Sequence, residues 1–186
     1  PVIRMSFNGE LRDGQAEAVE RLLEFENGIL SAPTGFGKTV IGAAVIARLK
    51  MPTLVIVPKT ALVPQWKERL GEFLDIDEEL PPLLTPTGRK SRRKRSLIGQ
   101  IGGGKNERSG IIDIATFQSL VEKDDGGCPR AKGFVKEYGL IVVDECHHGA
   151  APQLECILKA VNAQNVYGLS ATPKRADGLE GITYLL

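Results

Sequence analysis

The segment GILSAPTGFGKTVIGAAVIARLK, residues 28–50, joins a short apolar run to a helical pattern through a glycine-rich turn. The apolar run, residues 28–32, is typical of a buried strand, and residues 39–50 repeat apolar side chains at helical spacing. A strand that passes directly into a helix is half of a β–α–β unit, in which the next strand runs parallel to the first. This segment therefore predicts an α/β protein with a parallel sheet.

Four more short apolar runs follow along the chain. They are TLVIVP at 53–58, IIDIAT at 111–116, LIVVDE at 140–145 and VYGLSAT at 166–172. Most are continuous rather than alternating, which is typical of strands buried on both faces. Helical patterns lie at 39–50, 62–74 and 152–163, whereas 85–110 and 123–133 are expected to be exposed loops. The pattern predicts a mainly parallel central sheet flanked by helices, with ligands bound where the carboxyl ends of the strands meet.

The composition limits the kind of protein. A chain of 186 residues with 42% hydrophobic residues can form one domain, 1–186, around a single core. The 24 basic and 23 acidic residues nearly balance, so any nucleic-acid partner has to be argued from local features. Three cysteines without repeated spacing argue against a secreted disulfide framework, and no apolar run approaches the roughly 18–20 residues of a membrane span. We therefore expect a cytoplasmic protein with no membrane partner, cut from a longer chain.

The turn APTGFGKT, residues 32–39, has the pattern of a Walker A phosphate loop with Ala32 in place of the first glycine. A loop that wraps a phosphate points N–H groups inward, in conformations that a β-carbon disfavours, and Gly35 and Gly37 supply that freedom. Lys38 offers an ammonium to the β- and γ-phosphates, and Thr39 offers a hydroxyl to Mg²⁺. A glycine turn with a chance lysine is disfavoured, because strand and helix flank the loop as the motif requires. We therefore expect ATP and Mg²⁺ to bind at Thr34, Gly35, Phe36, Gly37, Lys38 and Thr39.

The stretch YGLIVVDECHHGA, residues 138–150, runs a predicted strand into two carboxylates. A phosphate-loop NTPase needs a carboxylate on another strand to hold Mg²⁺, and Asp144 has that position. Glu145, one residue beyond the strand, can orient and deprotonate the attacking water. The predicted catalytic residues are therefore Lys38, Asp144 and Glu145.

A zinc site is the alternative interpretation of the same stretch. Cys146, His147 and His148 are consecutive, whereas structural zinc sites space their ligands so that the backbone can turn around the metal. Neither Cys128 nor Cys156 has a neighbouring ligand with which to complete a tetrahedron. We therefore expect Cys146 to be a small, half-buried side chain, and His148 to be a loop residue.

With the phosphate loop and DECH both present, the chain resembles the first RecA-like domain of superfamily 2 helicases and translocases over residues 11–175. LRDGQ at 11–15 looks like the segment whose glutamine, here Gln15, reads the adenine. VPKTALVPQW at 57–66 and IATFQSL at 114–120 look like motifs Ia and Ic, and LSATPKR at 169–175 looks like motif III. Within the superfamily, the chain looks closest to restriction-enzyme translocation subunits and XPB-like translocases. The resemblance implies a RecA-like P-loop NTPase fold.

The resemblance also implies roles for residues outside the ATP site. Motifs Ia and Ic would contact a nucleic-acid strand, and His147, the last residue of DECH, would couple the ATP site to motif III. The residues implied to contact the nucleic-acid strand are Pro58, Lys59, Thr60, Thr116 and Gln118. The residues implied to couple the ATP site to the strand-binding surface are His147, Ser170 and Thr172. A capping role is the alternative for His147.

The function implied is ATP-dependent movement on nucleic acid, with DNA favoured over RNA. The family completes its ATP site with an arginine from a second RecA-like domain of the same polypeptide, which nothing in this sequence resembles. Such an arginine contributes roughly 10³- to 10⁵-fold in related phosphoryl transfers, so the isolated chain should bind nucleotide and hydrolyse it slowly. The alternatives are a nucleotide-dependent nucleic-acid-binding clamp, an RNA helicase domain, and a P-loop enzyme of another kind.

Three features stay open on the sequence alone. Residues 89–95 carry six basic side chains in seven positions, which suits either a phosphate-binding loop or a solvated linker balanced by DIDEEL at 75–80. Trp66 fits either packing on a helix face or a contact to a base. Arg12 fits either a surface position or a contact beside the adenine.

Overall fold

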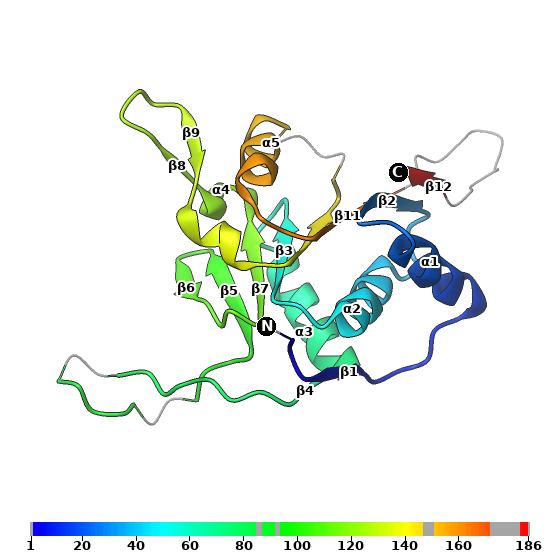
Figure 1. Cartoon of the computed structure of the whole chain (residues 1–186), viewed down its shortest axis with the longest axis horizontal. Helices are drawn as coiled ribbons and strands as arrows, with labels where there is room; N and C mark the ends of the chain where they lie inside the picture. Colours follow the sequence, from blue (N-terminus) through cyan, green and yellow to red (C-terminus); the bar gives the residue numbers. More distant parts are fainter. Residues whose placement is uncertain (1, 85–86, 92–93, 147–150, 172–182, 186) are drawn as a thin grey trace.

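Six parallel strands form the centre of an eight-stranded sheet in the computed structural model (Figure 1). In sheet order they are β2 (Asn27–Ala32), β11 (Asn165–Ala171), β10 (Leu140–Asp144), β3 (Thr53–Val57), β7 (Ile112–Thr116) and β5 (Ile98–Gly102). Two antiparallel strands flank them, β12 (Thr183–Leu185) beside β2 and β6 (Lys105–Glu107) beside β5. The structure describes residues 2–84, 87–91, 94–146, 151–171 and 183–185. The fold class predicted from the alternating strand and helix patterns is confirmed.

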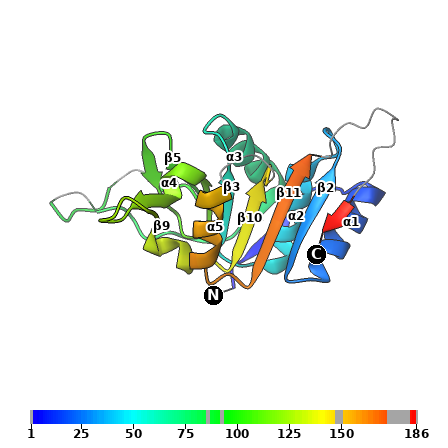
Figure 2. The same ribbon diagram turned by 90° about the horizontal axis from the view of Figure 1, so that it is seen from above.

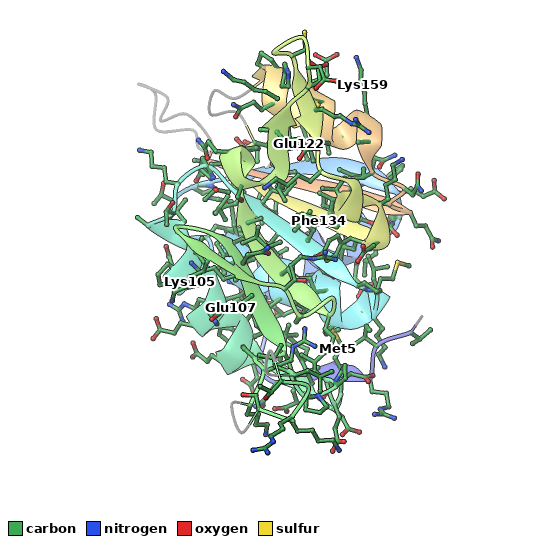
Figure 3. The ribbon with its side chains drawn as sticks, turned by 90° about the vertical axis from the view of Figure 1, so that its left-hand side faces the viewer. Met5, Lys105, Glu107, Glu122, Phe134 and Lys159 are labelled. Atoms are coloured by element: carbon green, nitrogen blue, oxygen red, sulfur yellow. The ribbon has the colours of Figure 1, made fainter. Side chains whose placement is uncertain are left out.

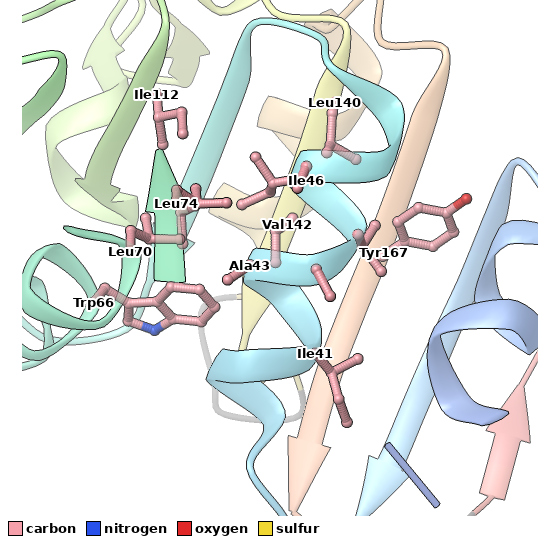
Figure 4. Packing of buried hydrophobic residues seen from close by; sticks show 14 of the residues in the cluster. Ile41, Ala43, Ile46, Trp66, Leu70, Leu74, Ile112, Leu140, Val142 and Tyr167 are labelled. Carbon is pink, nitrogen blue, oxygen red and sulfur yellow. The ribbon is translucent and has the colours of Figure 1, made fainter. Parts of the chain in front are cut away.

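Helices cover both faces of this sheet, because its strands are apolar on both sides. In β3, Val55 and Val57 face one core, whereas Leu54 and Ile56 face another. The first core is covered by α1 (Asp13–Leu23), α2 (Lys38–Leu49) and α3 (Leu62–Phe73), and Figure 4 shows part of it. The second is covered by α4 (Phe117–Leu120), the 3₁₀ turn η1 (Gly133–Glu137) and α5 (Ala151–Ala160). Figure 2 shows α2 and α5 on opposite sides of the sheet.

The five predicted strands and three predicted helices are all present, with α5 ending at Ala160 rather than at residue 163. Two loop predictions are wrong in part. Residues 98–102 and 105–107 form β5 and β6 at the edge of the sheet, where Lys105 and Glu107 are exposed (Figure 3). Residues 121–131 form a hairpin of β8 (Val121–Lys123) and β9 (Pro129–Ala131). A second small sheet pairs β1 (Met5–Phe7) with β4 (Leu74–Ile76).

A buried carboxylate explains why β5 contains glycine. Asp113 is fully buried in β7, and its side chain accepts hydrogen bonds from the N–H groups of Ser109 and Gly110 at 2.7 and 2.8 Å. The phenol of Tyr138 donates a further bond at 2.7 Å. A β-carbon at Gly99 of β5 would overlap this carboxylate. The glycine that suggested a loop is therefore required by packing inside the sheet.

No helix within the described part of the chain is both long enough and apolar enough to cross a bilayer.

Candidate functional site

The carboxyl ends of the parallel strands meet at one edge of the sheet, and the predicted functional segments lie there. The glycine loop follows β2, residues 58–60 follow β3, Asp144 ends β10, and Ser170 lies near the end of β11. In the strand order β2–β11–β10–β3, these segments come from four consecutive strands. This is the edge at which doubly wound α/β proteins bind ligands.

The glycine loop has the backbone that its sequence predicts. Gly35 and Gly37 have φ angles of +84° and +89°, a region that other residues rarely adopt. A β-carbon at Gly37 would overlap the side-chain amide of Gln15, whereas one at Gly35 would meet no atom within 4 Å. Helix α2 begins directly at Lys38, so its first N–H groups, which have no partners within the helix, directly follow the glycine loop.

The side chains of Gln15 and Arg12 both form hydrogen bonds to the glycine loop. The carbonyl of Phe36 accepts hydrogen bonds from Gln15 Nε2 at 2.8 Å and from Arg12 Nη2 at 2.9 Å. Gln15 Oε1 accepts a further bond from the backbone N–H of Arg12 at 3.0 Å, and the glutamine is only 5% exposed. The N–H of Phe36 is engaged with the carbonyl of Pro33 at 3.1 Å. The predicted adenine-reading residue is thus attached to the phosphate loop.

Lys38 and Asp144 are close enough to interact electrostatically. Lys38 Nζ donates to the carbonyl of Ala32 at 3.3 Å, and its charge acts to lower the pKa of Asp144. Burial nevertheless dominates and raises the pKa of Asp144 above its ordinary value, and the negative charge of Glu145 acts in the same direction. Thr39, the second residue of α2, is half-buried. The structure therefore brings the predicted catalytic side chains together.

One partner of Asp144 was not anticipated from the sequence. Nε1 of Trp66 donates a hydrogen bond to Asp144 Oδ2 at 2.7 Å, and this bond acts to lower the carboxylate's pKa. Trp66 is 1% exposed, so packing on the helix face is confirmed. The two residues are 78 positions apart, and no local pattern could have paired them.

Glu145 has a strained backbone. Its φ is +49°, one of two positive values among the described residues other than glycine. Such a conformation costs about 1–3 kcal/mol and persists only where the surroundings impose it. Here the N–H of the next residue, Cys146, bonds to the carbonyl of Leu169 in β11 at 3.2 Å. The turn after β10 is thereby tied to the neighbouring strand, and the predicted half-burial of Cys146 is confirmed.

The remaining predicted coupling residues are only partly described. Ser170 is 8% exposed, and its hydroxyl donates to the carbonyl of Ala171 at 3.3 Å. In the parallel pairing of β10 and β11, Asp144 lies opposite Leu169, so Ser170 is one residue from the end of that pairing. His147, His148 and Thr172 lie outside the described residues.

The donor set at this edge fits Mg²⁺. A magnesium ion in a nucleotide site is held by one or two protein oxygens together with substrate phosphates. The hydroxyl of Thr39, at the start of α2, and the carboxylate of Asp144, at the end of β10, are such oxygens. Within the described residues, no group of three or more His, Cys, Asp and Glu side chains is placed so that it could hold a metal ion.

A second group of predicted residues lines a hollow of ≈ 570 Å³ farther along the same edge. Its lining residues are Pro58, Lys59, Thr60, Gly102, Gly103, Thr116, Gln118 and Ser119. The structure thus brings together all five residues that are predicted to contact a nucleic-acid strand. Lys59, Thr60 and Gln118 are exposed, whereas Thr116 is 4% exposed and bonds to Ser119.

The glycine turn in this hollow was missed as part of the site. Gly102, Gly103 and Gly104 all have positive φ, between +63° and +116°. A β-carbon at Gly103 would lie 2.8 Å from Cγ2 of Thr60, so only glycine allows this close approach. The signal was present as three consecutive glycines in IGGGK, inside a stretch that was interpreted as an exposed loop.

Arg95, the last residue of the basic run at 89–95, lies away from this hollow. It precedes β5 and donates to the carbonyl of Arg108, which precedes β7, at 2.7 Å. Because β5 and β7 are parallel, these residues lie at the amino edge of the sheet, opposite Gly102 and Thr116. Arg95 and the hollow therefore lie at opposite edges of the sheet.

Residues 8–175 match the ResIII family, described as "Type III restriction enzyme, res subunit". The chain belongs to this family. The predicted resemblance to the first RecA-like domain of superfamily 2 helicases is confirmed by this match and by the relatives of the ResIII domain described next.

Two curated relatives are named as DNA motors. The ResIII domain is 33% identical to "DNA 3'-5' translocase XPB2" of Sulfurisphaera tokodaii over 91% of this chain and 32% of that protein. It is 31% identical to "DNA 3'-5' helicase XPB" of Kineococcus radiotolerans over 95% of this chain and 28% of that protein. The chain thus spans about a third of the length of these relatives.

Solved structures share the fold of the ResIII domain. The UvsW helicase of bacteriophage T4 matches 96% of this chain and 58% of that chain, with a TM-score of 0.62 and 21% identity. The SWI2/SNF2 ATPase core of Sulfolobus solfataricus, solved with double-stranded DNA, matches 94% of this chain and 35% of that chain, with a TM-score of 0.63 and 20% identity. These identities support the architecture alone.

Proposed function

We propose that this domain binds Mg²⁺ and ATP and, joined to a second RecA-like domain of the same polypeptide, hydrolyses ATP to move along DNA. One observation carries the proposal: the glycine loop, Lys38, Asp144 and Glu145 meet at the carboxyl edge of the sheet. ATP hydrolysis needs this combination of a phosphate cradle, a cation, a metal-binding carboxylate and a base.

Each residue has a separate task in the proposed reaction. The loop from Thr34 to Gly37 and the first N–H groups of α2 bind phosphate oxygens, and Lys38 leaves the carbonyl of Ala32 to reach them. Thr39 and Asp144 hold Mg²⁺, which when bound neutralises charge on the phosphates. The carboxylate of Glu145 orients the attacking water and accepts its proton.

Gln15 would recognise the adenine while remaining attached to the loop. Each of its two amide atoms makes one hydrogen bond in the structure, and each has the capacity for one more. A base bound there would therefore be connected to the carbonyl of Phe36 through a single side chain. Arg12 Nη2 donates a hydrogen bond to the same carbonyl, which favours a supporting role for Arg12 beside the adenine.

The hollow beyond β3, β7 and β5 is the proposed track for the nucleic acid. Lys59 provides a positive charge, and Thr60 and Gln118 provide exposed polar groups. Pro58 and Thr116 shape the wall, and the turn at 102–104 is a position where a phosphate could approach the backbone closely. DNA is the favoured track because both relatives above carry DNA in their names.

Motif III would couple the ATP site to the hollow that is proposed to bind nucleic acid. Ser170 is buried beside the strand that carries Asp144, and His147 and Thr172 complete the proposed set. Their role would be to transmit the state of the bound nucleotide to the nucleic-acid surface. The second RecA-like domain would contribute an arginine to the same ATP site.

The decisive experiment measures ATP hydrolysis by a protein extended through the second domain. The rate is measured at fixed low salt with no nucleic acid, with duplex DNA, with single-stranded DNA and with RNA, and with Lys38→Ala as the inactive control. Stimulation by DNA supports the proposed motor. Stimulation by RNA alone would favour an RNA helicase domain, and nucleotide-dependent DNA binding without turnover would favour a clamp. A rate that no nucleic acid changes would favour a P-loop enzyme of another kind.

A further inference from the structure

Trp66 is the one tryptophan of the sequence, and it contacts the proposed metal ligand directly. The indole lies on α3 and packs beside α2 in the first core (Figure 4). It is 1% exposed, and its Nε1 donates to Asp144 Oδ2 at 2.7 Å. The side chain therefore combines packing in the core with a polar contact at the site.

Close packing restrains the ring that donates this bond. Gly42 of α2 approaches the ring so closely that an added β-carbon would lie 2.9 Å from Cη2 and 3.3 Å from Cζ3 of Trp66. An indole has one N–H donor and no acceptor, so it can bind a carboxylate oxygen but can neither bind nor replace a metal ion. A carboxylate has about four lone-pair sites on its two oxygens, so the bond at Oδ2 leaves the group able to bind a metal ion as well.

We propose that Trp66 is a positioning residue for Asp144. By holding Oδ2, the indole fixes the rotation of the carboxylate and presents the group in one orientation to Mg²⁺ and the bound nucleotide. Groups that orient metal ligands in this way commonly contribute 10- to 100-fold in metal affinity. The inference rests on the proposed function, because Asp144 is a metal ligand only if the domain binds Mg²⁺ with ATP.

The same bond connects the two parts of the site. Helix α3 begins at Leu62, two residues after Thr60 in the hollow, and Trp66 lies in the second turn of that helix. A displacement of residues 58–60 by a bound strand would therefore reach Asp144 through one helix and one hydrogen bond. The backbone of Glu145 also bonds to this carboxylate, so the indole acts on it together with the turn after β10.

The test measures how nucleotide binding by this chain depends on Mg²⁺. A fluorescent ATP analogue is titrated against the wild-type chain, Trp66→Phe and Leu70→Ala, first in EDTA and then over a range of Mg²⁺ concentrations. Trp66→Phe keeps an aromatic ring but loses the N–H donor. Leu70→Ala is the matched control, because Leu70 is fully buried one turn farther along α3 and does not contact Asp144 through a hydrogen bond.

We expect Trp66→Phe to need roughly 10-fold more Mg²⁺ for half-maximal binding, with unchanged affinity in EDTA. Leu70→Ala should keep the wild-type Mg²⁺ dependence. An unchanged Mg²⁺ requirement in Trp66→Phe, or an equal rise in both variants, would overturn the inference. If the wild-type chain binds no nucleotide, the proposed function fails, and the inference fails with it.

A second measurement decides the matter if Trp66→Phe does not fold. The wild-type chain labelled with ¹⁵N-tryptophan gives a single indole N–H resonance, because the sequence contains one tryptophan. Adding Mg²⁺ to the nucleotide-bound chain should shift this resonance, since the metal withdraws electron density from the carboxylate that accepts the bond. An indole resonance that stays in place while Mg²⁺ binds would overturn the positioning role.

Discussion

Replacing Gly42 with alanine sets two known effects against each other. Alanine in place of glycine inside a helix normally stabilises a protein by roughly 0.5–1 kcal/mol. At Gly42 of α2, however, the new methyl group would lie 2.9 Å from the ring of Trp66, which is buried and held by its bond to Asp144. Overpacking a core costs about 1–3 kcal/mol, and a rigid ring favours the upper part of that range. We therefore expect Gly42→Ala to lower the free energy of unfolding by about 1–2 kcal/mol.

Urea unfolding followed by far-UV circular dichroism measures this change without using the fluorescence of the displaced tryptophan. With a slope of about 2 kcal/mol per molar urea, the midpoint should fall by roughly 0.5–1 M. Gly71→Ala on α3 is the matched control, because no atom lies within 4 Å of the added β-carbon and the helix propensity should act alone. Its midpoint should rise. A Gly42→Ala variant as stable as the wild type would refute the close packing of Gly42 against the indole.

Three further predictions follow from the described contacts. Lys38→Ala should remove most ATP affinity in calorimetric titrations, whereas Glu145→Gln should keep ATP affinity and abolish turnover in the two-domain protein. Lys59→Ala should lower the slope of log affinity for DNA against log salt by about 1, if this lysine neutralises one phosphate. Tyr138→Phe should lower the free energy of unfolding by about 1–3 kcal/mol, because it removes the phenol's bond to the buried carboxylate of Asp113. Burial raises the pKa of Tyr138 above its ordinary 10.0, so the phenol ionises in the unfolded chain at a lower pH than in the folded chain. The stability that this phenol contributes should therefore be lost as the pH rises above 10.0. In urea unfolding, the midpoint of the wild type should fall over this alkaline range more than the midpoint of Tyr138→Phe does.

The central strands were predictable because their signal is local. In β3 all five residues are buried, so a continuous apolar run identifies the strand without knowledge of its neighbours. Strand β5 gave no such signal, since Gly99 and Gly102 lower the strand propensity of IGQIG. The reason for Gly99 is the carboxylate of Asp113 on the adjacent strand, 14 positions later in the chain. A residue required by a partner across the sheet cannot be interpreted from its own segment.

The candidate ATP site likewise combines residues that local motifs reveal with residues that only the fold brings together. The roles of Lys38, Asp144 and Glu145 were predicted because short motifs carry them, and the structure places their side chains together. The attachment of Gln15 to Phe36 and the bond from Trp66 to Asp144 were not predicted, because each joins separate segments of the chain. Sequence motifs identified the groups that would touch the nucleotide, and the fold was needed to find the groups that hold them.

The order of three strands gives a physical reason why nucleotide and nucleic acid could be coupled in this domain. Strand β10, which ends at Asp144, lies between β3 and β11. The loop after β3 supplies Lys59 and Thr60 to the hollow, and β11 carries Ser170. Hydrogen bonds tie the end of β10 to both sides, from Trp66 to Asp144 and from Cys146 to Leu169. A change at the proposed metal ligand therefore has a short path to each neighbouring strand. Removing the indole N–H by Trp66→Phe should weaken coupling on the side of β3, while the backbone bond from Cys146 to Leu169 stays in place.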